Sequence, residues 1–211
     1  MESPDSQESA PIMNIVGERV MLGPLRREQI PLRLRWANDL TTNRAYDLPR
    51  PVTEETFRAT YDPVVGETRH IRFTLYERAT RRPIGHASLL RVELRDRTAE
   101  FDLLIGEADA RGRGYGTEAT QLVLDYAFTA LGLHSIFLRV YAFNLAGIRA
   151  YEKAGFREVA RRHECFWMGG RFWDMVFMDC LARESARSES PVLGRVFVPD
   201  APRPSREGGA G

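Results

Sequence analysis

The sequence has few cysteines and few lysines. Its 211 residues include two cysteines, Cys165 and Cys180, and one lysine, Lys153. The cysteines have neither the paired spacing of a metal site nor the companions of a disulfide framework, so we expect reduced thiols on strands and no metal. The shortage of lysine also bears on nucleotide chemistry, because a P-loop requires a lysine directly after its last glycine.

The sequence also has no excess of positive or negative charge and no long apolar run. The formal net charge is +1, and arginines alternate with acids instead of forming a basic block, so no nucleic-acid surface is expected. No apolar run approaches the roughly 20 residues of a membrane-spanning helix. The opening MESPDSQESAP is acidic and polar, unlike a signal peptide. We therefore expect a cytoplasmic protein that binds neither nucleic acid nor membranes.

The composition predicts one folded domain between two tails. A hydrophobic content of 43% is enough for one sizeable α/β core at this length. Residues 1–13 and 185–211 are polar or rich in Pro, Gly and Ser, which is typical of flexible ends. We expect 200–211 to be dispensable, whereas the apolar segment 192–198 is either unstructured or packed on the domain or on a second subunit.

Apolar periodicity predicts the elements of the domain. Strands are expected at 16–25, 69–78, 83–94 and 99–106, and helices at 27–39 and 53–64. A last hairpin should turn at Gly169 and Gly170, with four aromatic side chains packed in the core: Phe166, Trp167, Phe172 and Trp173.

The most informative segment is RGRGYGT at 111–117, which follows a strand and leads into a helix-like stretch. Alternating glycines let the backbone turn tightly and approach a ligand, and the positive end of the helix dipole points at the same place. This arrangement suits a diphosphate. The candidate contacts are Arg111, Gly112, Arg113, Gly114, Tyr115, Gly116 and Thr117.

Two familiar phosphate-binding motifs do not fit this loop. Thr117 and Glu118 follow Gly116 without a lysine, which excludes a P-loop. A dinucleotide fingerprint fits only in its alanine form, and it would open the first βαβ unit of a domain, whereas this loop lies past the middle of the chain. A plain glycine-rich turn between a strand and a helix remains the simpler alternative.

Later segments favour a ligand-binding loop. Arg111-x-x-Gly114-x-Gly116, followed by Asn144, Ala150-Tyr151 and Gly155-Phe156, resembles the GNAT acyltransferases over about 14–184. The likeness is greatest to the branch with spermidine N-acetyltransferases and enzymes that acetylate ribosomal-protein N-termini. It implies one α/β GNAT-type domain with a mixed, mostly antiparallel sheet, splayed at its central strands and flanked by about four helices.

The resemblance also implies a co-substrate and contacts to it. Acetyl-CoA would bind the 111–117 loop, and its pantetheine would pair with the end of a splayed strand at Leu103, Leu104 and Ile105. Asn144 would contact CoA by its side chain, although it is equally suited to cap the helix that follows.

Acetyl transfer further needs an acid and a base. Tyr151 matches the family tyrosine that protonates the thiolate leaving group, and a packed amphipathic tyrosine is the alternative. Strand alternation places Glu100 and Asp102 on one face, and either is a candidate base, direct or through water, or a structural partner of an arginine. His86 and His134 are weaker candidates.

The acceptor is expected to be a primary amine of a small cationic molecule. Acidic and aromatic groups that suit a cation occur at Trp36, Asp39, Asn43, Tyr46, Asp47, Glu54 and Glu55. A polyamine, an amino sugar or an aminoglycoside fits this pattern. A protein N-terminus, or a module that senses acetyl-CoA without transfer, is the alternative, and a homodimer is left open.

Overall fold

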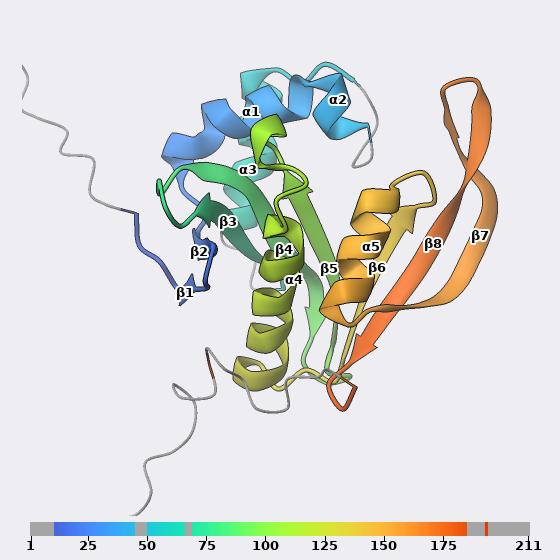
Figure 1. Cartoon of the computed structure of the whole chain (residues 1–211). Coiled ribbons are helices and arrows are strands. Elements are labelled where there is room, and N and C mark those ends of the chain that lie inside the picture. Colours follow the sequence, from blue (N-terminus) through green and yellow to red (C-terminus); the bar gives the residue numbers. More distant parts are fainter. Residues whose placement is uncertain (1–10, 45–49, 66–68, 185–192, 194–211) are drawn as a thin grey trace, which may run out of the picture.

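The computed structural model describes residues 11–44, 50–65, 69–184 and 193 (Figure 1). Their strands form one sheet in the order β1-β2-β3-β4-β5-β6-β8-β7, in which β5 and β6 run parallel and the other neighbours antiparallel. This confirms the predicted mixed α/β sheet. The helices and strands are β1 (Ile15–Val16), β2 (Val20–Pro24), α1 (Ile30–Asn38), α2 (Leu40–Asn43), α3 (Glu54–Val65), β3 (Ile71–Glu77), β4 (Pro83–Glu93), β5 (Thr98–Ile105), α4 (Tyr115–Asp125), β6 (Ser135–Tyr141), α5 (Leu145–Ala154), β7 (Arg157–Met168) and β8 (Arg171–Leu181).

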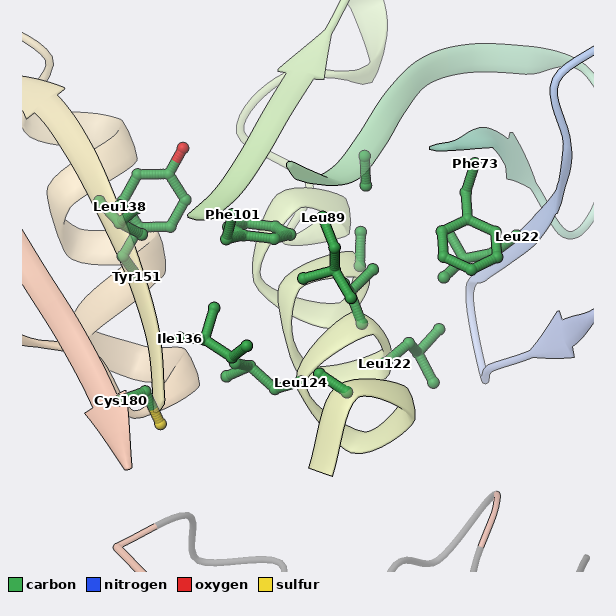
Figure 2. Packing of buried hydrophobic residues seen from close by; sticks show 14 of the residues in the cluster. Leu22, Phe73, Leu89, Phe101, Leu122, Leu124, Ile136, Leu138, Tyr151 and Cys180 are labelled. Carbon is green, nitrogen blue, oxygen red and sulfur yellow. The ribbon is translucent and has the colours of Figure 1, made fainter. Parts of the chain in front are cut away.

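One face of the sheet carries the main apolar core. Phe73, Leu89 and Phe101 project from three neighbouring strands toward Leu122 and Leu124 of α4, as Figure 2 shows. These side chains are nearly inaccessible to solvent, and burying each contributes about 1.5–3 kcal/mol. The core therefore fixes α4, and with it the loop that precedes α4, against the central strands.

The opposite face is polar and lies under the N-terminal helices. Thr74 on β3, which alternates with Phe73, donates its hydroxyl to Gln29 just before α1 at 2.5 Å. At the end of β5, a Cβ on Gly106 would lie 2.2 Å from the Trp36 ring, so only glycine lets α1 approach this closely. The first helices are thus anchored at the end of β5.

The β7–β8 hairpin extends from the edge of the sheet (Figure 1). Gly169 and Gly170 turn it with φ of 62° and 81°, as predicted. The prediction that its aromatics all belong to the core is wrong for Trp167 and Phe172, which are 60% and 55% exposed. They lie near the hairpin tip, past the helices that cover the sheet. Phe166 instead stacks on the ring of Tyr141 from β6, and Trp173 meets the ring of Phe143 edge-on, so both are packed although neither belongs to the buried core cluster.

The chain ends are only partly within the described residues. Of the predicted tails, 1–10, 185–192 and 194–211 lie outside them. Leu193 is described, and with 6% exposure it belongs to the buried core cluster. The apolar segment 192–198 therefore places at least this side chain against the domain.

The described part of the chain also bears on the cysteines, on membrane-spanning helices and on metal ligands. Cys165 and Cys180 are free thiols, on β7 and β8 as expected. No helix there has both the length and the apolar composition needed to cross a bilayer. No group of three or more His, Cys, Asp or Glu side chains is arranged in these residues to hold a metal ion.

Candidate active site

The site begins where β5 and β6 part. Their parallel register runs from Thr98 opposite Ser135 to Glu100 opposite Phe137, although β5 continues to Ile105. The far half of β5 therefore turns its edge toward the opening and not toward β6. Helix α5 lies beside this opening (Figure 1). A strand edge with free backbone groups can hydrogen-bond an extended ligand.

The glycine loop meets the same opening. Gly112 and Gly114 have φ of 72° and 80°, values that L-residues rarely adopt, and α4 begins at Tyr115 directly afterwards. Because the helix begins here, the N–H groups of the first turn of α4 have no carbonyl partners within the helix. They are therefore available to an anion. The backbone geometry thus fits the predicted diphosphate site.

A pocket of about 490 Å³ joins the loop and the strand opening. It is lined by most of the predicted cofactor contacts, namely Leu103, Leu104, Ile105, Arg111, Gly112, Gly114, Tyr115, Gly116, Thr117 and Asn144, and also by Tyr151. Arg113 is the predicted contact that is not in the lining. A cavity with this lining and a glycine cradle fits the diphosphate and pantetheine of CoA.

The pocket also has lining residues that sequence reasoning missed. From α2 and its end come Thr41, Thr42 and Arg44, and from α5 come Ala146, Gly147, Arg149, Ala150 and Lys153. The α5 set recurs every three or four residues, which is the signature of one helix face. The same spacing can be read from the sequence. It marks a helix face that carries the cations Arg149 and Lys153 among small side chains.

Arg111 and Arg113 point to different places despite their similar settings. Arg111 lines the pocket and donates to the hydroxyl of Thr42 at 2.6 Å and to the carbonyl of Ile105 at 3.1 Å. Arg113 donates to the carboxylate of Glu77 at 3.0 Å. Of the two predicted phosphate contacts, the structure therefore leaves Arg111 beside the pocket and turns Arg113 away from it.

Asn144 combines both roles considered for it. Its side-chain oxygen accepts the N–H of Gly147 at 3.0 Å, so it caps α5, and the residue also lines the pocket. A cap at this position fixes the start of α5. The same residue can therefore hold the helix and face the ligand.

Tyr151 reaches the pocket from α5 and is only 8% exposed. Its ring meets Phe101 edge-on, and in Figure 2 its hydroxyl is directed away from Leu138 and Ile136. Burial, and secondarily the negative charge of Asp102, raise its pKa well above the usual value of 10. The phenol therefore remains protonated at neutral pH, as a proton donor must.

The two candidate bases have different surroundings. Glu100 is buried between Arg139, whose Nε lies 2.8 Å from the carboxylate, and Arg91. This pairing matches the structural alternative for Glu100. The charge of Asp102 raises the pKa of Tyr151, and the Asp102 side chain is 22% exposed, although the residue does not line the pocket. As the candidate base, Asp102 is the better placed of the two.

His86 is a neighbour of Asp102 on the polar face of the sheet. Its Nε2 lies 3.9 Å from the Asp102 carboxylate. Burial, with the positive charges of Arg33 and Arg72, holds the pKa of His86 well below 6.5. The imidazole is therefore neutral at physiological pH. His134, the other weak candidate, is exposed and directly precedes β6.

Most of the predicted acidic and aromatic acceptor wall has a structural task in the described residues. Trp36 is buried and donates its indole N–H to Glu107 at 2.9 Å. Asp39 accepts the N–H of Thr41 at 3.0 Å as the cap of α2, and hydrogen bonds from Thr42 and Thr41 lower its pKa to about 2.

The other predicted wall residues are partly described. Asn43 is buried and donates to the carbonyl of Ala37. Glu54 pairs with Arg58 at 2.7 Å on α3, and Glu55 is exposed one residue later. Tyr46 and Asp47 lie outside the described residues. The acceptor contacts therefore stay a prediction.

Comparison with known proteins agrees with this geometry. A family model described as the acetyltransferase (GNAT) domain matches residues 19–157. The chain is 30% identical over 146 residues to spermidine N(1)-acetyltransferase of Vibrio cholerae serotype O1, which covers 67% of this chain and 83% of the relative.

Solved structures are similar as well. Spermidine N-acetyltransferase from Vibrio cholerae in complex with CoA and spermine matches with a TM-score of 0.74 and 25% identity, over 80% of this chain and 98% of that chain. A dodecameric structure of spermidine N-acetyltransferase from Vibrio cholerae in an intermediate state matches with a TM-score of 0.67 and 25% identity, over 79% of this chain and 95% of that chain.

Proposed function

The chain belongs to the GNAT acetyltransferases, and on that premise we propose that it transfers the acetyl group of acetyl-CoA to a primary amine of a polyamine. The thioester of acetyl-CoA supplies the activated acetyl group. The observation that carries the proposal is Tyr151, a buried phenol that lines the pocket and whose pKa is raised by burial and by the charge of Asp102. Direct transfer to an amine requires a proton donor for the leaving thiolate and a base for the ammonium.

In this proposal, backbone groups bind the co-substrate and two side chains transfer protons. Backbone N–H groups of the loop at 112–117 bind the diphosphate, and the edge of β5 at Leu103–Ile105, which does not pair with β6, holds the pantetheine. Asp102 takes a proton from the acceptor ammonium, directly or through water, so that the nitrogen lone pair can form the C–N bond. As the C–S bond breaks, Tyr151 gives its proton to the sulfur. The nitrogen loses its second proton to water as the amide forms, and a proton from water restores the phenol.

The choice of a polyamine rests on the relatives. Spermidine is the substrate in the names of the similar enzymes, and one of the matching structures contains CoA and spermine. On the sheet face under α1, the positive charges of Arg33 and Arg72 act on His86, which lies 3.9 Å from the Asp102 carboxylate. The acidic contacts that a polyamine needs are proposed at Asp47, Glu54 and Glu55.

Two further points stay predictions. A homodimer or a larger assembly is in keeping with the dodecameric relative. The cytoplasmic location expected from the sequence also goes with this proposal.

The test is an acceptor panel with acetyl-CoA and detection of the free thiol. Spermidine and spermine should support steady release, whereas an aminoglycoside, a peptide with a free N-terminus and an amine that carries a carboxylate should be much slower. Faster release with the carboxylate-bearing amine would replace the polyamine by an anionic acceptor that Arg33 and Arg72 select. Tight binding of acetyl-CoA with no release in the whole panel would favour the sensor.

A further inference from the structure

The outer side of the glycine loop, turned away from the pocket, is held by charged side chains. The guanidinium of Arg113 donates to Oε1 of Glu77 at 3.0 Å, and its carbon lies 5.0 Å above the ring of Tyr115. Arg113 is half-exposed, whereas Glu77 is buried. A cation in this position is largely neutralised by its partner and is not presented to a phosphate.

Glu77 is the centre of these contacts. It is the last residue of β3, and its Oε1 also accepts the hydroxyl of Tyr115 at 2.6 Å, while Oε2 accepts the hydroxyl of Thr80 at 2.7 Å. The hydrogen bonds, that of Tyr115 first, hold the pKa of Glu77 below its usual value. The carboxylate is therefore charged, and charge-assisted hydrogen bonds are the stronger kind.

A second clamp comes from the turn between β1 and β2. Arg19 donates to the carbonyl of Arg113 at 3.2 Å and to the carboxylate of Glu118 at 2.9 Å, and its backbone N–H donates to the same carboxylate at 2.9 Å. Glu118 lies in the first turn of α4, where a negative charge would repel a bound diphosphate. Arg19 neutralises that charge and fixes the loop from the same outer side.

We propose that Glu77 is a positioning residue for the co-substrate: by holding Arg113 and Tyr115 from outside, it fixes the loop so that its backbone N–H groups face the diphosphate. The inference rests on the proposed function, since it needs CoA in this pocket. Gly112 and Gly114 give the loop freedom that must be lost on binding. A loop that is already ordered loses less entropy when the ligand binds.

The alternative, in which Arg113 binds a phosphate directly, predicts the opposite sign for one variant. Glu77→Gln removes the negative charge and keeps the shape. If Glu77 positions the loop, CoA affinity should fall about tenfold, the worth of one charge-assisted hydrogen bond. If Arg113 is a phosphate ligand that Glu77 restrains, the same variant should bind CoA as tightly as the wild type or more tightly.

The experiment is calorimetric titration of CoA into the full chain and into Glu77→Gln, Arg113→Gln and the double variant. Both single variants should bind about tenfold more weakly, and the double variant hardly more weakly than either, because the two residues act as one unit. The KM for acetyl-CoA should rise while kcat and the KM for the amine stay within about twofold. General destabilisation would instead lower kcat too.

Thr80→Ala is the matched control. It removes a hydrogen bond to the other oxygen of Glu77 but no contact to the loop, so its CoA affinity should equal that of the wild type. Should Glu77→Gln fail to fold, Tyr115→Phe removes only the hydroxyl donor and should show the same loss of affinity. Unchanged or tighter binding by the folded Glu77→Gln or Tyr115→Phe variant overturns the proposal. A wild type that does not bind CoA overturns the proposed function and this inference together.

Discussion

The ring of Tyr151 meets the ring of Phe101 edge-on, with 6.1 Å between the ring centres and an angle of 89° between the ring planes. Phe101 belongs to β5 just beyond the last residue paired with β6, so the contact fixes the tyrosine at the opening between the two strands. The aromatic ring provides the packing, and the hydroxyl is left for chemistry. Packing and catalysis by Tyr151 can therefore be separated by removing one atom.

Tyr151→Phe should lower kcat by about 10²–10⁴, the usual worth of a positioned general acid. The ring contact with Phe101 should survive, so the variant should bind CoA like the wild type. In the wild type, kcat should not decline on the alkaline side up to about pH 10, because the pKa of Tyr151 is raised above that of a free tyrosine. Steady-state kinetics from pH 7 to 10 checks both outcomes. Turnover by the variant within a few-fold of the wild type, with chemistry rate-limiting, would show that another group is the acid.

The neutral state of His86 predicts a pH dependence of stability. In the unfolded chain an imidazole takes up a proton near pH 6.5, whereas the folded pKa lies well below that value. The unfolded state therefore binds more protons as the pH falls below 6.5, and the free energy of unfolding decreases. Between pH 6.5 and 5, the melting temperature should fall more steeply in the wild type than in His86→Gln. Equal slopes would mean that His86 takes up its proton in the folded protein.

The cations of α5 predict recognition of a third phosphate. Arg149 and Lys153 line the same pocket as the first turn of α4, where the diphosphate is placed. CoA differs from dephospho-CoA by the 3′-phosphate, which these side chains can bind. The wild type should prefer CoA by about tenfold or more, and Arg149→Ala with Lys153→Ala should lose the preference. Calorimetric titration with both ligands measures it, and an equal preference in the double variant would contradict this assignment.

The buried position of Leu193 predicts a difference between two truncations. Ending the chain after Pro199 should leave the melting temperature and acetyl transfer unchanged. Ending it after Ser190 removes Leu193 from the core and should cost about 1.5–3 kcal/mol of stability, as expected for a buried leucine. Thermal unfolding of the two truncated chains decides this, and equal melting temperatures would mean that Leu193 contributes no stability.

The sequence predicts those structural features that depend on neighbouring residues along the chain. Alternation marked β3, β4 and β5, and the glycines predicted the left-handed turns at 112 and 114. The cap at Asp39 is also local, because its partners Thr41 and Thr42 lie two and three residues later, yet the sequence pattern favours an acceptor wall for this residue.

Features that depend on contacts between residues far apart in the chain could not be predicted from the sequence. Arg111 and Arg113 have equivalent local settings, and only Glu77, 36 residues earlier, turns Arg113 away from the pocket. Trp36 has the residue type of a substrate platform, but Gly106 leaves space for its ring, and the packing of α1 buries it. Glu100 similarly depends on Arg139 from the parallel neighbour β6.

The central claim is direct transfer from acetyl-CoA to an amine at the pocket that Tyr151 lines. The most direct measurement is a quenched reaction with spermidine, in which free CoA thiol and acetylated amine are quantified in the same sample by mass spectrometry. The account predicts that both products form in equal amounts with the wild type, and far more slowly with Tyr151→Phe. Thiol release without acetylated amine, or bound acetyl-CoA that stays intact in the presence of the amine, would contradict it.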